Sequence, residues 1–305
     1  MKIYLHADDY GLTKKITDDI LECIDAGVIN SISIMANGYA FDYSVQELLK
    51  RKEKNINLVL HLNLDQGCAL ADSKLLTNNK GQLDKGFEGI FWRNLLLCDS
   101  ERNKLRSEIY NEMEQQIIKV LPLFESLRRP LKLDGERCTH LVPIVFDSIL
   151  KLSKKYPTKS IRIVRESWLF ILSRYPQCFL SAGILKLLIL RIFSFTGKYE
   201  NKLRDQKISF SDYTFSTVKS GELTQSFIEH FLIYIRNEKN LEVEVVFHPF
   251  KPLVQELFLW TDRYIYRNHF ASSKRGKEKS ELLTHQKYFS SLGKKQYDKV
   301  KAHLL

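Results

Sequence analysis

Short runs of apolar, β-branched residues recur along the chain, and longer segments with helical periodicity separate them. This alternation is typical of βα units arranged around a parallel sheet. Seven strands, close to the eight of a TIM barrel, predict an α/β fold: a distorted (β/α) TIM-like barrel with about seven parallel strands. The predicted strands cover Lys2–Ala7, Ser31–Met35, Ile56–Leu64, Leu131–Leu133, Ser160–Val164, a weaker run near Ser209–Phe215, and Val243–Phe247.

Two of the intervening segments have clear helical spacing. Lys14–Ala26 and Glu101–Leu127 place apolar residues three and four positions apart, which predicts two helices that coat the barrel. Asn78–Gly89 is rich in Gly, Asn and Asp, which predicts a loop above the barrel mouth. The sequence has no internal repeat and no low-complexity linker, so we expect residues 1–305 to form one domain.

The segment Trp168–Phe195 is strongly apolar, is interrupted by Pro176 and Gly183, and carries three basic residues. It is too interrupted and too charged to predict a membrane span. Two interpretations remain open. The segment forms a helical hairpin packed on the barrel, as an apolar helical insertion around residues 168–200, or Ala182–Phe195 forms a cationic amphipathic helix at a membrane surface.

Composition agrees with a globular protein: the chain has 305 residues, of which 44% are hydrophobic and 27% charged. Met1 and Lys2 lead directly into the first predicted strand, so we expect no signal peptide and a cytoplasmic location, with peripheral contact at the inner face of the membrane left open. The five cysteines are scattered without paired spacing, which argues against a disulfide framework and against a zinc-thiolate cluster.

The formal net charge of +11 predicts attraction to an anionic partner. Nucleic acid, a membrane surface, and a phosphorylated or lipid-linked sugar all meet this description. The basic residues are spread along the chain and no basic-aromatic nucleic-acid motif is present, so we do not expect nucleic acid to be the partner. The oligomeric state stays open.

Polar residues follow one predicted strand after another, at the end where a parallel α/β barrel carries its reactive groups. Taken singly, a histidine in a strand is more often a core residue, and aspartates before a helix often only cap it. The coincidence of carboxylates, imidazoles and arginines at one end of the sheet favours an active site. These residues are Asp8, Asp9, His61, Asn63, Asp134, Glu136, Cys138, His140, Arg162, Arg165, Glu166, Asp212 and His248.

Asp8 and Asp9 are adjacent, so their side chains point in different directions and their like charges separate their pKa values. One carboxylate can hold a metal ion while the other moves protons. Oxygen and imidazole ligands suit one divalent ion such as Mg, Mn, Co or Zn. Because the cysteines are not clustered, we expect the ion to be catalytic and not structural.

These residues are similar to motifs of the YdjC-like (ChbG/HpnK) carbohydrate deacetylases, a family related to the polysaccharide deacetylases. The resemblance covers nearly the whole chain in the right order, and the first and third of the matching segments carry its most specific motifs. It implies a distorted barrel and a metal-dependent hydrolase that removes the N-acetyl group from an amino sugar. The matching segments are residues 6–13, 60–64, 133–143, 161–166, 212–215, 220–224 and 247–249.

Carried over position by position, the resemblance implies that Asp9 and His61 bind the metal, that Asp8 is the general base and that His248 is the acid. The third ligand of the family is a histidine, and Glu136 stands at its position. A carboxylate can replace an imidazole in a divalent site, so we expect Asp9, His61 and Glu136 to bind the ion, with a preference for Mg or Mn.

Further departures from the family pattern lie beside these positions. Cys138 replaces the next histidine of the motif, His140 alone remains of its three histidines, and His6 replaces an asparagine. We expect Asn63 and His140 to contact the substrate. Arg165 is expected to contact the substrate or to orient an acidic partner, with an ion pair to Glu166 as the alternative.

Other functions remain open at this stage. In a catalytically drifted barrel, Glu136 would pair with Arg137 or Arg165, and the protein would bind a sugar or a lipid headgroup without metal chemistry. A hydrolase of another amide or of a phosphoester and a nucleic-acid binder are further alternatives. For the deacetylase, an oligosaccharide and a lipid-linked glycan both fit the motifs, and the charge and the apolar segment favour the lipid-linked one.

Overall fold

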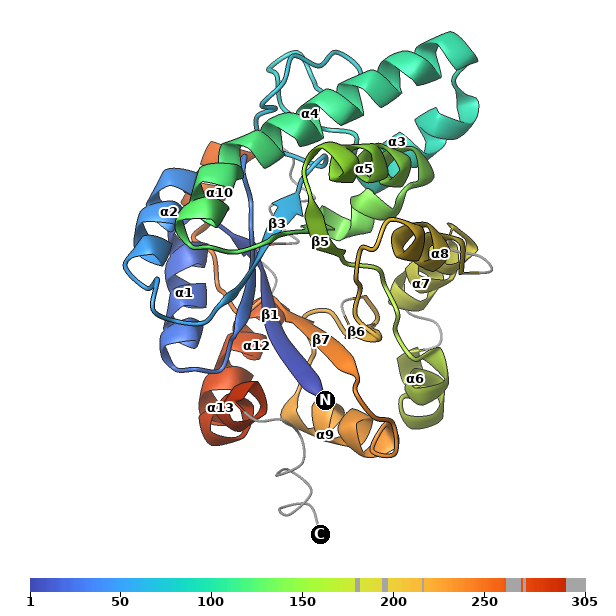
Figure 1. The fold of residues 1–305 in the computed structure, drawn as a ribbon. Coiled ribbons are helices and arrows are strands. Elements are labelled where there is room, and N and C mark those ends of the chain that lie inside the picture. The colour runs from blue at the N-terminus through green and yellow to red at the C-terminus, as the bar shows by residue number, and fades with distance from the viewer. Residues whose placement is uncertain (179–181, 194–196, 216, 262–269, 271–272, 295–305) are drawn as a thin grey trace.

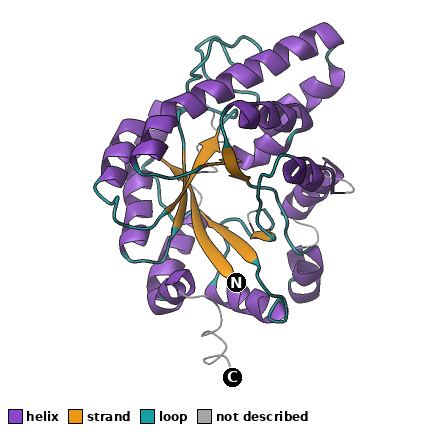
Figure 2. Ribbon diagram, in the orientation of Figure 1, coloured by secondary structure: helices purple, strands orange, loops and turns teal. Residues whose placement is uncertain are grey.

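The computed structural model describes residues 1–178, 182–193, 197–215, 217–261, 270 and 273–294. Its centre is a sheet of seven parallel strands that curls into a partial barrel, with helices around its outside (Figures 1 and 2). The strand order is β5-β4-β3-β2-β1-β7-β6. The strands are β1 (Lys2–Tyr10), β2 (Ser31–Ile34), β3 (Asn57–Leu62), β4 (Leu131–Gly135), β5 (Thr158–Ile161), β6 (Tyr213–Phe215) and β7 (Glu242–Phe247).

Helices connect the strands and continue after the last one. Before β5 these are α1 (Lys14–Asp25), α2 (Phe41–Leu49), α3 (Gly86–Leu96), α4 (Asp99–Ser126), the 3₁₀ helix η1 (Glu136–Leu141) and α5 (Pro143–Lys155). After β5 come α6 (Trp168–Arg174), the 3₁₀ helix η2 (Pro176–Cys178), α7 (Ala182–Phe193), α8 (Lys198–Asp205), α9 (Gln225–Tyr234), α10 (Val254–Trp260), α12 (Ser273–Thr284) and α13 (Gln286–Lys294).

The sheet nearly closes between its two edge strands. Ser209, which precedes β6, pairs with Ser160 of β5 in a parallel bridge. Its amide donates to the carbonyl of Lys159 at 3.0 Å, and its carbonyl accepts from the amide of Ile161 at 3.1 Å. The barrel therefore closes through a short bridge in place of an eighth strand, which confirms the predicted distorted barrel with seven parallel strands.

All seven strands form where the sequence predicts them, and two extend further than predicted at their carboxyl ends. Strand β1 continues past Ala7 to Tyr10, and β4 continues to Gly135. Both extensions hold buried aspartates, which in the sequence look like the polar end of a strand. Lys14–Ala26 and Glu101–Leu127 are confirmed as helices α1 and α4 to within two residues.

The loop predicted over Asn78–Gly89 is correct only in its first part, because residues 86–89 form the first turn of α3. Phe87 and Ile90 are buried there and anchor the helix. Within the apolar segment 168–195, α6, η2 and α7 form, while residues 179–181 and 194–195 lie outside the described part of the chain. Among the described helices, none combines the length and hydrophobicity that a bilayer crossing requires.

Candidate active site

An irregularity inside β1 sets the directions of Asp8 and Asp9. The register between β1 and β2 shifts between Ala7 and Tyr10, and Asp9 has a φ of 70°, in the left-handed region. The two carboxylates therefore enter different clusters. Gly38 packs against the turn that follows β1 so closely that a Cβ at its position would lie 2.1 Å from the carbonyl oxygen of Gly11.

The first cluster consists of Asp9, His61 and Glu136, from β1, β3 and η1. One ligand atom of each residue lies within 4.8 Å of the others, and all three side chains are buried. His61 Nε2 lies 3.1 Å from Glu136 Oε2 and 3.9 Å from Asp9 Oδ1. The three residues that the sequence assigns to the metal site thus come together, although they are up to 127 positions apart in the chain.

Burial and neighbouring charges shift the pKa values of all three residues in this cluster. Burial, and then the nearby carboxylate of Glu136, raise the pKa of Asp9 well above its usual range. Burial also acts to raise the pKa of Glu136, but the hydrogen bond and charge of His61, together with the charges of Arg275 and Arg137, outweigh it and lower this pKa to about 2. Burial acts to lower the pKa of His61, but Asp134 and Asp8 raise it well above its usual range.

These residues fit a divalent ion. Asp9 Oδ1 is buried and has no hydrogen-bond partner in the described part of the chain. His61 Nδ1 lies 2.7 Å from Asp134 Oδ1, so a proton held on Nδ1 would let Nε2 bind a metal ion in place of its hydrogen bond to Glu136 Oε2. A carboxylate that holds the far nitrogen of a histidine in this way is the usual outer-shell partner of a metal-binding imidazole.

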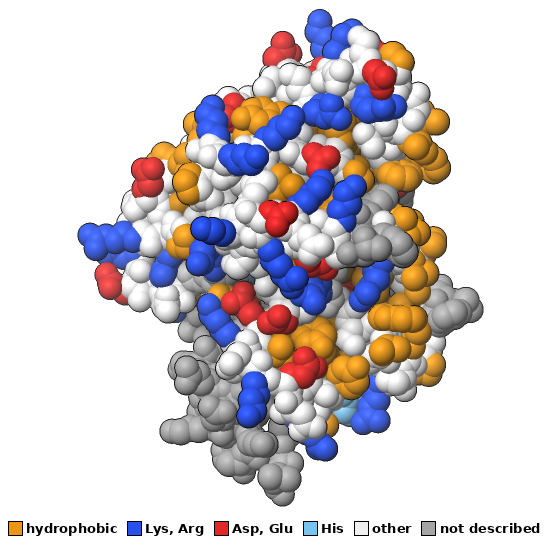
Figure 3. Space-filling model, turned by 45° about the vertical axis from the view of Figure 1, so that its right-hand side comes forward, with side chains coloured by type: hydrophobic (Ala, Val, Ile, Leu, Met, Phe, Trp, Pro, Cys, Tyr) orange, Lys and Arg blue, Asp and Glu red, His pale blue; other side chains and the backbone are white. Residues whose placement is uncertain are grey.

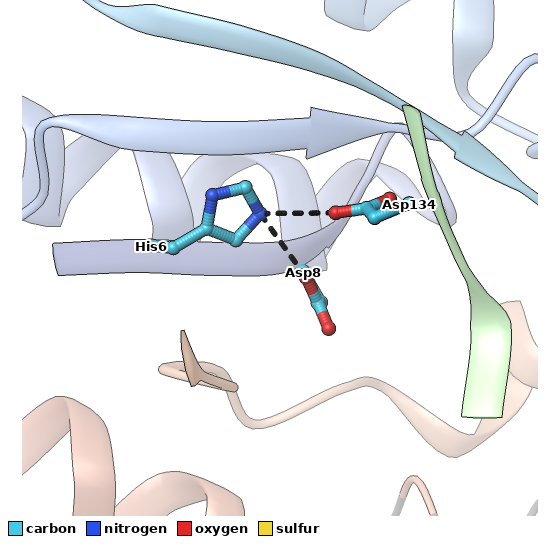
Figure 4. Close-up of side chains that lie close together, drawn as sticks. All are labelled: His6, Asp8 and Asp134. Carbon is cyan, nitrogen blue, oxygen red and sulfur yellow. Dashed lines mark ion pairs between the residues drawn. The ribbon is translucent and has the colours of Figure 1, made fainter. Parts of the chain in front are cut away.

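The second cluster consists of His6, Asp8 and Asp134 (Figure 4). It adjoins the first cluster through the contact of Asp134 with His61. His6 Nε2 lies 3.1 Å from Asp8 Oδ1 and 3.5 Å from Asp134 Oδ2. Ser33 donates to Asp8 Oδ1 at 3.0 Å. Arg162 contacts both carboxylates, Asp8 Oδ1 at 3.0 Å and Asp134 Oδ2 at 2.8 Å, and also Glu244 Oε2 at 3.0 Å.

Arg162 keeps the carboxylates of the second cluster ionised. Burial acts to raise the pKa of Asp8, but Arg162 and then His61 hold it well below its usual range. The pKa of Asp134 is likewise lowered, because Arg162 and His61 together outweigh the effect of burial. A guanidinium therefore balances these carboxylates, and the carboxylate of Asp8 is ionised at neutral pH.

His248 follows β7 and lies at the same end of the sheet. Its Nε2 is 3.9 Å from Asp8 Oδ2, so the predicted base and acid face each other. Its backbone amide donates to Glu278 Oε2 of α12 at 2.7 Å. The side chain is 9% exposed, so it lies at the boundary between the buried clusters and solvent.

Three other predicted site residues, Arg165, Asn63 and His140, belong to neither cluster. Arg165 lies over the ring of Phe210, at 5.4 Å, and lines an outer pocket of about 320 Å³ with Glu166, so the structure does not bring it to Asp8. Arg162, three residues earlier, takes that place. The carboxylate of Glu166 accepts hydrogen bonds from the amides of Thr217 and Val218. The sequence offers an ion pair between Glu166 and Arg165 as the alternative role of Arg165.

Asn63 and His140 are buried and hydrogen-bonded within the protein. The Asn63 amide donates to Asn37 Oδ1 and to the Gln66 carbonyl, and its oxygen accepts from the amides of Asp65 and Gln66. His140 Nε2 lies 2.9 Å from the carbonyl oxygen of Arg162. Both side chains therefore shape the loops around the site, and their contact with a substrate stays a prediction.

Sequence reasoning missed Arg275 of α12, which donates from Nη1 to Asp9 Oδ2 at 3.1 Å. It is buried, but it lies in a polar helix after the last recognisable motif, so no strand end marks it. Arg137 lies 3.1 Å from Glu88 Oε1, and its charge also lowers the pKa of Glu136, after the larger effects of His61 and Arg275.

Residues 2–287 of the chain match a family model described as YdjC-like protein, which confirms the resemblance seen in the sequence. The protein named carbohydrate deacetylase 2 of Listeria innocua is 26% identical over 176 residues, which are 55% of this chain and 66% of that relative. This chain therefore matches slightly less than two thirds of the relative's length.

A crystal structure from Enterococcus faecalis, described as a cellobiose-phosphate cleavage protein, has a TM-score of 0.58 to this structure. The two chains are 17% identical, and the comparison covers 93% of this chain and 94% of that chain. A likeness at this identity shows a shared fold.

Replacing Arg162 tests its role as the common partner of three buried carboxylates. We expect Arg162→Met to lower the free energy of unfolding by about 3–5 kcal/mol at pH 7, because it leaves buried carboxylates unpaired. Urea unfolding measures this loss. Arg129→Met is the control, since the half-buried side chain of Arg129 bonds only Asn55 and the Lys54 carbonyl in the described structure, and a change within about 0.5 kcal/mol is expected. Equal effects of the two substitutions would contradict the role of Arg162.

His140 predicts a pH dependence of stability. Burial lowers its pKa from 6.5 to about 4, so the unfolded chain takes up the proton first as the pH falls. The neutral histidine therefore favours the folded state above pH 6.5, and this advantage is lost between pH 6.5 and 4. Between pH 6.5 and 4, the free energy of unfolding of the parent should fall by roughly 3 kcal/mol more than that of His140→Gln. Unfolding at a series of pH values measures it, and equal slopes would refute the prediction.

Proposed function

The chain belongs to the family of YdjC-like proteins, and we propose that it is a metal-dependent hydrolase that removes the N-acetyl group from an amino sugar. The observation that carries the proposal is the convergence of Asp9, His61 and Glu136 beside the charged carboxylate of Asp8 and the imidazole of His248. The carbohydrate deacetylase among its relatives supports the same reaction class.

Asp9, His61 and Glu136 would hold the divalent ion. When bound there, such an ion polarises the acetamide carbonyl and lowers the pKa of water. Two carboxylates and one imidazole favour Mg or Mn over softer ions. The rise in the pKa of Asp9 supports the same assignment, since a cation would relieve the repulsion between the carboxylates of Asp9 and Glu136.

Asp8 would take the proton from the attacking water. Its carboxylate is ionised and held by Arg162 and Ser33 through Oδ1, while Oδ2 faces His248. His248 would donate a proton to the sugar nitrogen as the C–N bond breaks, so that a neutral amine leaves. One water is consumed, and the products are acetate and the free amino sugar.

We further propose that the sugar is lipid-linked, because helix α7 is apolar on two faces. Ile184, Leu187 and Leu190 are buried against the barrel, whereas Leu185, Leu188 and Ile192 are 62%, 51% and 67% exposed. A helix that is apolar all round normally has its second face covered, by protein or by lipid.

The surroundings of α7 favour an anionic lipid surface as the cover. The Lys186 Nζ donates to the carbonyl of Arg137, next to Glu136, so α7 lies beside the loop that brings Glu136 to the site. Lys186 also lies 5.6 Å from the ring of Phe87 in α3. The side of the molecule where α6–α8 lie shows apolar side chains next to Lys and Arg side chains (Figure 3), and the net charge is +11.

The drifted, binding-only function has one observation in its favour. Arg275 places a permanent positive charge beside Asp9, where a metal ion would also act. In that case the barrel would bind a sugar or lipid headgroup without hydrolysing it. Metal binding separates the two functions.

Metal binding and acetate release test the proposed reaction together. We expect the parent to bind about one Mn or Mg ion per chain, and Glu136→Gln to bind it at least about 100-fold more weakly, because one ligand charge is lost. Calorimetry measures the affinity, and a coupled acetate assay measures the reaction on chito-oligosaccharides and on a lipid-linked N-acetylated amino sugar.

Glu112→Gln is the matched control. Glu112 lies in α4 and is also buried, but its carboxylate accepts hydrogen bonds from the amides of Leu70 and Ala71, away from both clusters. It should keep metal affinity within about twofold of the parent. A parent that binds none of Mg, Mn, Co or Zn at millimolar concentration would refute the metal-dependent reaction.

Sedimentation with vesicles tests the lipid surface. We expect the parent to bind vesicles that contain anionic phosphatidylglycerol, and Leu188→Glu to weaken binding about tenfold, because a buried leucine contributes roughly 1.5–3 kcal/mol. Ile118→Glu on α4 is the control, since Ile118 is 44% exposed in another helix. Binding of all three proteins alike, or of none, would refute the role of α7.

A further inference from the structure

Helix α12 docks on the barrel through polar side chains on one face. Glu278 and Lys279 follow Arg275 by three and four positions, so all three lie on one face of the helix. Leu282, on the same face, is buried. Glu278 accepts from the amides of His248 at 2.7 Å and Leu223 at 3.2 Å. Lys279 contacts Asp19 and Glu22 of α1, both at 2.6 Å. These contacts hold α12 against the end of β7 and against α1.

In this docked position, α12 places Arg275 beside Asp9 of the first cluster. We propose that Arg275 is a positioning residue that orients Asp9 for metal binding, with the ligand role of Asp9 taken from the proposed function. Arg275 does not itself contact the reacting atoms in this proposal. It acts by fixing which oxygen of Asp9 faces His61 and Glu136.

The contacts of Asp9 carry this inference. Its Oδ2 accepts from Arg275 Nη1 at 3.1 Å, whereas Oδ1 has no hydrogen-bond partner in the described part of the chain and lies 3.9 Å from His61 Nε2. The two oxygens of one buried carboxylate are thus divided between a guanidinium and an open position. Carboxylate ligands of metal sites are commonly hydrogen-bonded in this way through the outer shell.

The guanidinium itself is held in place. It is stacked near two aromatic rings, 5.1 Å from the centre of Phe250 and 4.7 Å from that of Phe270. Arg275 is 5% exposed, so its position is set by packing and not by solvent. A rigid donor of this kind can restrict rotation of the Asp9 carboxylate, which a flexible surface arginine cannot do.

The sign of the effect on metal affinity distinguishes positioning from competition. Arg275 is a cation, so by Coulomb repulsion alone its removal would strengthen the binding of a second cation at the same cluster. If Arg275 orients Asp9, its removal instead weakens binding, because the ligand oxygen is no longer directed. The two roles therefore predict opposite changes.

The experiment measures Mn affinity by calorimetry for the parent, Arg275→Gln and Lys279→Met. We expect Arg275→Gln to bind Mn about 10–100-fold more weakly, as for other outer-shell partners. Lys279→Met removes a docking contact of the same helix that touches neither cluster, and its affinity should stay within about twofold of the parent. Unchanged or tighter binding by Arg275→Gln would overturn the proposal, and so would equal weakening by both variants.

A metal-free measurement keeps this test separate from that of the proposed reaction. Urea midpoints of chelator-treated Arg275→Gln, Asp9→Asn and the double variant show whether the two side chains are coupled. We expect the double variant to shift the midpoint clearly less than the sum of the single shifts. A parent without metal affinity would refute the proposed reaction while this coupling still supports the orientation of Asp9, and additive shifts would overturn that orientation whether or not metal binds.

Discussion

The structure depends on how one buried guanidinium balances carboxylates from several strands. Arg162 follows β5, while its partners Asp8, Asp134 and Glu244 lie on β1, β4 and β7. Its backbone amide also donates to the Leu133 carbonyl at 2.9 Å. Unpaired buried charges are costly, so the curl of the sheet and the ionisation of the carboxylates are fixed together. Any motion that separates β5 from β1 would also break this charge balance.

The same charge balance gives two adjacent aspartates different protonation behaviour. Asp8 is held charged by Arg162, whereas Asp9 faces Glu136, and its pKa is raised by burial and by that carboxylate. The left-handed backbone at Asp9 makes this division possible, since it turns the second side chain toward β3 and η1. In the proposed reaction, the two neighbouring residues can therefore act as proton acceptor and as cation ligand without two charged carboxylates competing for one position.

Strand periodicity determines which site residues could be predicted from the sequence. It identifies strand ends, and so it found Asp8, Asp9, His61, Glu136 and His248 on the correct edge of the sheet. It does not encode side-chain direction beyond that edge, which is why Arg165 was chosen where the structure places Arg162. Arg275 reaches Asp9 across 266 positions from a polar helix, and only the folded packing of α12 brings the two together.

Arg275 also bears on the substitution that separates this chain from the motif it resembles. Glu136 stands where the resemblance implies a neutral histidine, and it adds a negative charge to a buried cluster. Arg275 and Glu136 act on Asp9 in opposite directions, since the carboxylate raises the pKa of Asp9 and the guanidinium lowers it. The extra carboxylate is therefore accompanied by a cation in the same cluster, and its charge is partly offset.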